Sequence, residues 1–268
     1  MPIISLESLW WKHGFVYAGD VRLKTTKFKS TQGCDLFNVY DVHGQTVVFV
    51  VKRFKRGNEG EYDTERYMVD KIRQAQLTCF VRTFAMNEFS IAMDKYEGDC
   101  SELQWGKVSV EEIEVLVKRW RDELQSMVDH GLYYTDCKWN NILYSTTRRS
   151  DGVLDTKWCD LGSLAINEWT CQTFPYPGHY DYRDYDATIE PASERVVVWG
   201  LAILWMQLLG QNRLVCDTLC HSLQSSRSVR AFYRQMRPLA LPDALRAMLE
   251  LTIHQLRDVH ALSLEQCP

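Results

Sequence analysis

The sequence predicts an α+β protein, with a strand-rich first third that holds one helix and a larger helical part after about Tyr96. Two patterns lead to this class. Short apolar, β-branched runs separated by Gly-containing turns fill the first part, which is typical of strands. Later in the chain, apolar residues return at helical spacing over long stretches. With 268 residues, 46% of them hydrophobic, the chain can build a full core for a two-lobed domain.

The first third begins with strands. They are predicted within Val21–Phe54, with turns at Gln32-Gly33 and His43-Gly44. A helix is predicted over Glu59–Gln74, because Met68, Val69 and Ile72 follow Glu65 by three, four and seven residues and so share one helix face. Two more strands are predicted over Phe80–Ala85 and Phe89–Lys95, and a linker over Tyr96–Asp99.

A long helix is predicted over Val110–His130 in the second part, on the basis of one apolar stripe: Ile113, Leu116, Val117, Trp120, Leu124, Met127 and Val128. Short strands are expected near Asn141–Tyr144 and Thr156–Cys159, with a polar hairpin between them. The segment from Ser163 to Glu194 has little periodicity and is predicted to be a long loop, either functional or disordered. Arg195–Leu209 is intensely apolar and is predicted to be a buried helix.

The composition argues against several classes of protein. The net charge is −4, so no strong attraction to nucleic acid or membrane is expected. No apolar run is long enough for a transmembrane helix, and Met1–Trp11 lacks the features of a signal peptide. Nine Cys without paired spacing fit reduced thiols in the cytoplasm or nucleus. Cys216, Cys220 and His221 are interpreted as packing residues of a helix rather than as metal ligands.

Three short motifs carry the chemistry. Between His130 and Leu143, an Asp, a Lys and an Asn stand at positions 136, 138 and 141, ahead of an apolar pair. Phosphoryl transfer needs such a set: an Asp for the attacking hydroxyl, a Lys for the transferring group and an Asn for Mg²⁺. Upstream, Thr46–Phe54 is an apolar strand with Lys52 near its end. Downstream, Asp160-Leu161-Gly162 follows a short strand.

These three motifs, in this order, resemble the strand lysine, catalytic loop and metal motif of eukaryotic-type protein kinases. Lys138, two residues after Asp136, is similar to serine/threonine kinases. Tyr-Thr-Asp with Asp-Leu-Gly-Ser also resembles divergent kinases that large DNA viruses encode. The resemblance covers about residues 30–265. It implies one protein-kinase-like domain over 1–268, bilobal, with a small N-lobe over about 1–96 and a larger helical C-lobe over about 97–268.

The resemblance also implies ATP and Mg²⁺ as cofactors, and a protein as substrate. Lys52 is expected to hold the α- and β-phosphates and to pair with Glu65, for which Glu61 is the rival. Four more polar residues have expected roles. Asp136 is expected to orient the substrate hydroxyl and Lys138 to contact the γ-phosphate. Asn141 and Asp160 are expected to bind Mg²⁺.

The nucleoside pocket follows from the same resemblance. Met93 resembles the gatekeeper, Asp94–Tyr96 the hinge that binds the base, and Asp99 a ribose ligand. Three apolar side chains are expected to enclose the adenine: Val39, Val50 and Leu143. Val50 stands where the family usually has Ala, so the space above the adenine is expected to be smaller. Packing in the core is the alternative for these residues.

Several features depart from the family pattern. Aligned on Val39, the three positions of the Gly-rich loop hold Gln32, Cys34 and Phe37, while Gly33 is one residue out of register. The His-Arg before the catalytic Asp is Tyr134-Thr135, so a phosphorylated activation loop lacks its usual Arg partner. Other scaffold residues also differ from the family pattern. Val197 stands where the large-lobe helix has Asp, and Ala261 replaces an Arg near the end of the chain. The end of the activation segment has no clear Pro-Glu, and its candidates are Thr173–Pro177, or Asp184 or Asp186.

Three functions are therefore open. The first is an active serine/threonine protein kinase. The second is a pseudokinase that acts by binding a partner, which the missing Gly-rich loop favours. The third is a small-molecule kinase of the aminoglycoside-phosphotransferase type, a family that shares the Asp-x₄-Asn loop. The sequence does not indicate an oligomeric state.

Overall fold

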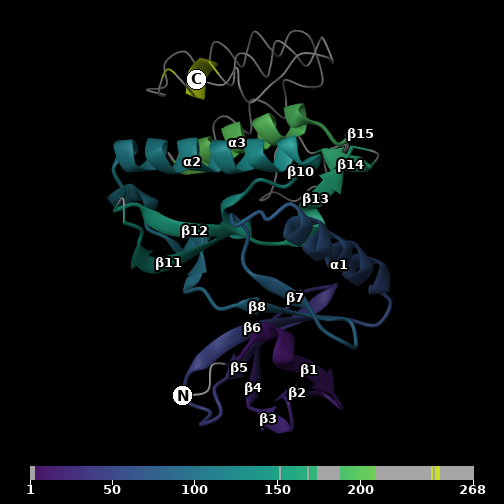
Figure 1. The fold of residues 1–268 in the computed structure, drawn as a ribbon. Helices are drawn as coiled ribbons and strands as arrows, with labels where there is room; N and C mark the ends of the chain where they lie inside the picture. Colours follow the sequence, from purple (N-terminus) through teal and green to yellow (C-terminus); the bar gives the residue numbers. More distant parts are fainter. Residues whose placement is uncertain are drawn as a thin grey trace. The chain divides into compact units, whose positions relative to one another are not determined.

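The computed structural model confirms an α+β protein, in which several antiparallel sheets accompany the helices α1, α2 and α3 (Figure 1). The structure describes residues 4–208, except 151, 168 and 174–187, together with 243 and 245–247. The chain forms two compact units. The first comprises Met1–Glu97 and Lys157–Gly162, and the second comprises Gly98–Thr156 and Ser163–Pro268.

The first unit is built on a five-stranded antiparallel sheet in the order β4-β5-β6-β8-β7. Its strands are bounded as follows: β4 Thr25–Ser30, β5 Cys34–Tyr40, β6 Val47–Phe54, β7 Thr83–Ala85 and β8 Ser90–Asp94. The strands and turns expected between residues 21 and 54 are confirmed. The two later strands are shorter than predicted, because pairing begins only at Thr83 and at Ser90.

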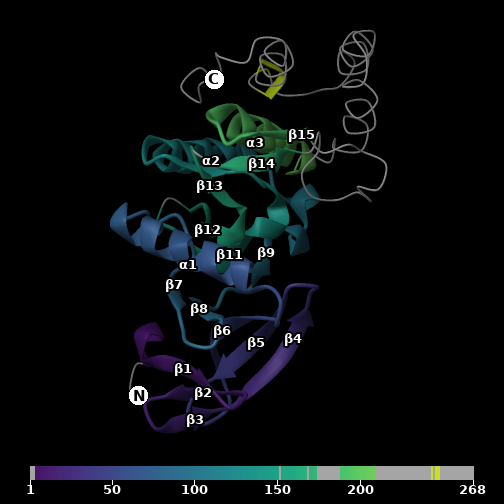
Figure 2. The same cartoon turned by 90° about the vertical axis from the view of Figure 1, so that its right-hand side faces the viewer.

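A second, three-stranded sheet packs on one face of the first and was not predicted (Figure 2). It consists of β1 Leu9–Lys12, β2 Phe15–Ala18 and β3 Val21–Leu23, preceded by the 3₁₀ turn η1 Leu6–Ser8. A two-residue turn, His13-Gly14, joins β1 to β2 with positive φ at both residues. The core between the sheets is apolar, with contributions from both: Leu9, Trp11, Val16, Leu23, Val39, Phe49, Val51 and Ala92.

Helix α1, Glu59–Gln74, matches its predicted bounds. Acidic Glu59 and Glu61 lie in its first turn and basic Lys71 and Arg73 in its last, an order that the helix dipole favours. Its buried face contains Tyr62, Glu65, Met68, Val69 and Ile72. The Tyr62 hydroxyl donates 2.8 Å to the Met86 carbonyl, which ties the helix to the sheet of its own unit.

The second unit contains α2, Val110–Asp129, and α3, Glu194–Leu208, which lie side by side (Figures 1 and 2). Ser109 caps α2, accepting a hydrogen bond from the Glu112 N–H. Most of the predicted stripe of α2 is buried, with Trp120 fully enclosed. The predicted bounds of α3 differ by one residue at each end.

Short strands complete the second unit. Strand β9, Gly98–Asp99, pairs with β11, Ile142–Arg148, where the sequence predicted only a linker. The expected strand near Thr156 is β12, Leu154–Trp158. The predicted long loop after Ser163 is partly wrong, because it contains three strands: β13 Leu164–Ile166, β14 Thr170–Thr173 and β15 Thr188–Pro191. Strand β13 pairs with β10, Leu132–Tyr134. Among the described residues, no helix is long and apolar enough to cross a membrane.

Candidate functional site

Three charged residues of the first unit form a connected group, here called the lysine set: Lys52, Glu65 and Asp160. The Lys52 ammonium donates to a carboxylate oxygen of Glu65 and lies 3.3 Å from the Asp160 carboxylate. Lys52 projects from the central strand β6, and Glu65 from the buried face of α1. The ion pair expected between Lys52 and Glu65 is therefore present, and the rival Glu61 is exposed.

Burial and charge shape the titration of this set. Burial disfavours the Lys52 ammonium, but the nearby carboxylates of Glu65 and Asp160 outweigh it, so the pKa of Lys52 is raised. Burial raises the pKa of Glu65 to about 7 against the opposing pull of Lys52, and the Asp160 charge adds to the rise. Only 5% of Glu65 is exposed, whereas 39% of the Asp160 side chain is exposed, so the lysine set joins a buried carboxylate to one that faces solvent.

The backbone around Asp160 is held in an unusual conformation. Its φ is +57°, a left-handed value that Asp tolerates better than most residues. Just before it, Trp158 is fully buried and exchanges backbone hydrogen bonds with Cys79 and Val81 in the same unit. A Cβ at Gly162 would lie 3.2 Å from the Glu65 carboxylate, so the glycine leaves room for the lysine set.

The strand register corrects one predicted pocket residue. Val39 lies opposite Phe49 and is fully buried in the core beneath the three-stranded sheet, so it cannot line the face that carries Lys52. Asn38 instead lies opposite Val50, and Val50 also lies opposite Met93. Asn38, Val50 and Met93 therefore share the Lys52 face of the sheet, and all but Val50 are half-buried.

The same one-residue shift corrects the alignment of the missing Gly-rich loop. With Asn38 in place of Val39, the three positions fall on Thr31, Gly33 and Leu36, so Gly33 occupies the middle one. Gln32 and Gly33 form the two-residue tip between β4 and β5, where the Thr31 N–H donates 2.8 Å to the Cys34 carbonyl. The N–H groups of Gln32 and Gly33 donate to no other described residue, and such groups can bind a phosphate.

The first residue of the predicted hinge lies at the end of β8. The Asp94 N–H donates 3.1 Å to the Arg82 carbonyl, and the Asp94 carboxylate binds the Arg82 guanidinium at 2.9 and 3.0 Å. The Asp94 N–H is therefore used within the sheet, and a role for Asp94 in binding a base through its carbonyl stays a prediction. Tyr96 lies beyond the end of β8 and remains a hinge candidate.

In the second unit, the predicted ribose ligand Asp99 lies opposite Leu143 in the pairing of β9 with β11. Its carboxylate accepts hydrogen bonds from the N–H and hydroxyl of Ser101 and so caps the 3₁₀ turn Cys100–Glu102. Leu143 is half-buried, whereas its neighbour Ile142 is fully buried. These contacts give Asp99 a structural role and leave its expected nucleotide role as a prediction.

The predicted catalytic loop forms a second polar group, here called the loop set: Asp136, Lys138 and Asn141. The Lys138 ammonium lies 2.5 Å from the Asp136 carboxylate. The Asn141 side-chain NH₂ donates to the backbone carbonyl of Asp136 at 3.0 Å and to its carboxylate at 3.2 Å. The loop set therefore holds the Asp136 carboxylate in one orientation, with 30% of that side chain exposed.

Two contacts brace this loop within the second unit. Thr135, which stands where kinases have Arg, donates both its N–H and its hydroxyl to the Ser163 carbonyl at 2.9 Å. Cys137 is fully buried, and a Cβ added at Gly200 of α3 would lie 2.8 Å from its Cβ. Burial raises the pKa of the Cys137 thiol, which fits a packing residue rather than a nucleophile.

The donor chemistry fits a hard cation such as Mg²⁺. Asn141 uses its NH₂ group within the loop, and its side-chain oxygen has no partner among the described residues. Asp160 presents a carboxylate that is 39% exposed. Oxygen atoms of this kind, completed by water and phosphate, are what Mg²⁺ prefers. The described residues contain no group of three His, Cys, Asp or Glu side chains that could hold a metal alone.

The sequence reasoning missed Asn38, because β5 carries apolar residues on both faces and only its pairing with β6 fixes which of them lie on the Lys52 face. Other predictions lie outside the described residues, namely those on 174–177, Asp184, Asp186, Ala261 and the group of Cys216, Cys220 and His221. No model of a known protein family matches the chain, and no curated protein matches it either.

Proposed function

We propose that this protein is a serine/threonine protein kinase with a bilobal protein-kinase-like fold, which transfers the γ-phosphoryl group of Mg·ATP to a hydroxyl of a protein substrate. The lysine set carries the proposal. Lys52, with 14% of its side chain exposed, is bound to two carboxylates, one from a helix and one from an Asp-Leu-Gly motif. This is the arrangement that a phosphate-binding Lys requires in the family that the sequence resembles.

The loop set supplies the second part of the proposed reaction. Asp136 orients the substrate hydroxyl and accepts its proton, while Lys138 neutralises charge on the transferring group. Asn141 and Asp160 each offer an oxygen to Mg²⁺, which neutralises the phosphates when it is bound. Lys138 at two residues after Asp136 supports a serine/threonine rather than a tyrosine acceptor.

The backbone links the two sets. Asp160 precedes Ser163 by three residues, and the carbonyl of Ser163 accepts two hydrogen bonds from Thr135, the neighbour of Asp136. The order of these motifs along the chain supports the proposal that the lysine set and the loop set serve one reaction.

The hairpin at Gly33 supports an active enzyme over a pseudokinase. In the corrected alignment, a glycine stands at its tip, and two backbone N–H groups there donate to no described residue, although the Glu61 carboxylate lies beside Gly33 and would have to turn away for a phosphate to bind. Lys55 anchors this hairpin, because its ammonium donates to the Thr31 carbonyl and its N–H donates 2.9 Å to the Gly33 carbonyl. A held hairpin with available donors replaces part of what the missing glycines would provide.

The test is transfer of radiolabelled phosphate from Mg·ATP to a generic protein acceptor such as casein. Wild type should label the acceptor on Ser or Thr. Lys52→Met and Asp136→Asn should each reduce the rate by at least a hundredfold, while the exposed controls Lys107→Met and Asp63→Asn keep it. Asp136→Asn should still bind Mg·ATP, because Asp136 faces the hydroxyl rather than the nucleotide.

Nucleotide binding separates the three functions. Millimolar Mg·ATP should raise the melting temperature of wild type by a few degrees, since a ligand at 100 times its Kd stabilises by about 2.7 kcal/mol. Chelation of Mg²⁺ should remove most of that shift. Absence of a shift, with no heat of binding in calorimetry, would replace the kinase with a pseudokinase. Labelling of small hydroxyl acceptors but not of proteins would indicate the aminoglycoside-phosphotransferase type.

A further inference from the structure

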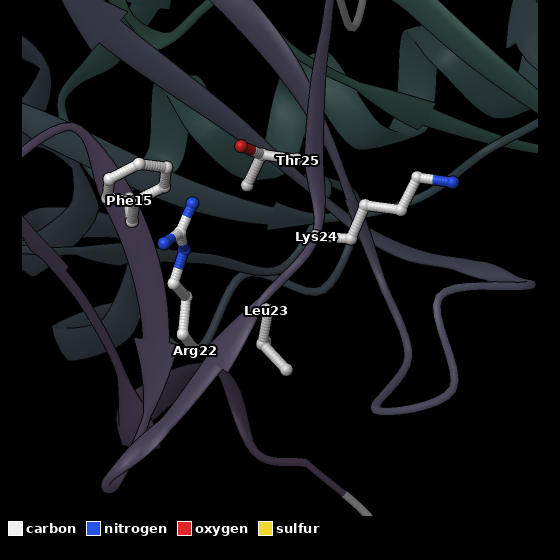
Figure 3. Close-up of a pocket in the computed structure, with 5 residues that line it drawn as sticks. All are labelled: Phe15, Arg22, Leu23, Lys24 and Thr25. Carbon is white, nitrogen blue, oxygen red and sulfur yellow. The ribbon is translucent and has the colours of Figure 1, made fainter.

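A second candidate site lies on the first unit, in a cavity of about 340 Å³ formed by β2, β3 and the start of β4 (Figure 3). None of its residues belongs to the lysine set. The lining combines an aromatic ring, two cations, one hydroxyl and one buried aliphatic side chain: Phe15, Arg22, Leu23, Lys24 and Thr25. A cavity of this size holds a small ligand or one side chain of a partner.

Arg22 is fixed in place without using its hydrogen-bond donors. The carbon at the centre of its guanidinium lies 3.3 Å from the centroid of the Phe15 ring, so the two planes stack. Among the described residues, the Arg22 side chain makes no hydrogen bond and no ion pair. Stacking restricts the side chain while all five N–H groups stay available, which lowers the entropy cost of binding an anion.

The other two polar side chains of the cavity, those of Thr25 and Lys24, differ in whether they have partners. The Thr25 side chain lies near Phe15 and Arg22, with its methyl group rather than its oxygen turned toward the guanidinium (Figure 3). The Thr25 hydroxyl has no partner among the described residues. The Lys24 side chain points away (Figure 3); its ammonium lies 3.4 Å from the Gly44 carbonyl and over the Tyr40 ring. Leu23 is buried and contributes an apolar part of the lining. The available donors are therefore those of Arg22 and Thr25.

The charge around the cavity favours an anion. Residues 21–30 contain four basic residues and no acidic one, in a chain whose net charge is −4. Two of them, Lys27 and Lys29, continue along the edge strand β4 and are exposed, although Lys27 has Asp35 at 3.7 Å. A guanidinium fork with a nearby hydroxyl matches the planar pair of oxygens of a carboxylate, or two oxygens of a phosphate.

We propose that the Phe15–Arg22–Thr25 cavity binds an oxyanion of an acidic peptide segment, either a carboxylate or a phosphoryl group, with Lys27 and Lys29 attracting the flanking acidic residues. One stacked guanidinium selects a single oxyanion, which suits a peptide better than the evenly spaced phosphates of a nucleic acid. The overall negative charge of the chain also disfavours nucleic acid. This inference does not depend on the proposed kinase activity.

Fluorescence anisotropy with labelled peptides tests the proposal on the full chain. The probes are a ten-residue Glu-rich peptide, the same peptide with one phosphoserine at its centre, a Gln-for-Glu peptide and a ten-nucleotide single-stranded DNA. We expect micromolar binding of one or both acidic peptides at low salt, weakened by added salt. The Gln peptide should bind at least tenfold more weakly, and the phosphoserine peptide shows whether phosphate or carboxylate is preferred.

The variants locate the binding. Arg22→Gln should weaken the acidic peptides at least tenfold and Thr25→Val about threefold. Arg56→Gln, an exposed control in the same unit with the same change of charge, should stay within twofold of wild type. Unchanged melting temperatures would show that the variants are folded. The proposal is overturned if neither acidic peptide binds, if Arg22→Gln and Arg56→Gln have equal effects, or if the DNA binds more tightly than both peptides.

Discussion

Asn38 lies directly opposite Val50 in the pairing of β5 with β6, on the face of the sheet that carries Lys52. Its amide is half-buried and makes no side-chain hydrogen bond with any described residue. In the proposed kinase this position contacts the nucleoside from above. A polar amide is thus expected where the sequence alone placed the apolar Val39.

Asn38→Val should strengthen Mg·ATP binding about three- to tenfold in calorimetry, because a hydrophobic roof avoids the cost of burying an amide, about 0.5–2 kcal/mol. Val39→Ala is the contrast, since Val39 lies in the core on the opposite face. It should lower the free energy of unfolding by about 1–3 kcal/mol and leave Kd unchanged. A changed Kd in Val39→Ala, with none in Asn38→Val, would falsify the assigned register.

The buried Glu65 predicts a pH dependence of stability. Its pKa is raised to about 7 in the folded protein, above its usual value near 4.5. The folded state therefore binds this proton more tightly, and the contribution of Glu65 to stability is complete below pH 4.5 and is lost as the pH rises to about 7. Urea unfolding of wild type relative to Glu65→Gln should show this loss as about 1–3 kcal/mol between pH 5 and pH 7.5. A difference that stays constant over this range would contradict the raised pKa.

Gly200→Ala should destabilise the second unit. The new Cβ would lie 2.8 Å from the Cβ of buried Cys137, so α3 or the loop must shift, at a cost of about 1–3 kcal/mol. Gly60→Ala provides the matched control, because a Cβ at Gly60 of α1 meets nothing within 4 Å. That control should stabilise by up to about 1 kcal/mol through helix propensity. Thermal melts compare the two, and equal shifts would argue against close packing at Gly200.

Thr135 predicts how the proposed kinase is regulated. Because its hydroxyl and N–H already hold the Ser163 carbonyl, the start of the following segment needs no phosphate for its position. Phosphatase treatment should leave the rate of peptide phosphorylation nearly unchanged, and Thr135→Val should lower it several-fold. Thr135→Ser, which keeps the hydroxyl, is the control. A tenfold loss after phosphatase, equal to about 1.4 kcal/mol of barrier, would show dependence on phosphorylation.

The sequence was sufficient for elements whose signals are local. Helix α1 was found with its ends because acidic and basic residues mark them and one apolar stripe runs between. The pairing of Lys52 with Glu65 was expected from the resemblance to protein kinases rather than from a local signal. The β1–β2 hairpin was missed although His13-Gly14, between two aromatic runs, is a recognisable turn signal.

Non-local pairing was beyond the reach of sequence patterns. Strand β13 is only three residues long and exists through pairing with β10, more than twenty-five residues earlier in the chain. Strand β5 carries apolar residues on both faces, so its sequence cannot decide whether Asn38 or Val39 faces Lys52. Because side chains alternate along a strand, that one-residue ambiguity exchanged a pocket residue for a core residue and misplaced the glycine of the β4–β5 hairpin.

The closeness of Gly162 to Glu65 gives a way to compare this protein with a homologue. Any side chain at position 162 would crowd the carboxylate that holds Lys52, since even a Cβ would come within 3.2 Å of it. A homologue that keeps lysine and glutamate but has a larger residue at position 162 should therefore hold its lysine differently. The presence of glycine at position 162 thus indicates how the Lys52–Glu65 salt bridge is arranged, although Glu65 lies ninety-seven residues earlier in the chain.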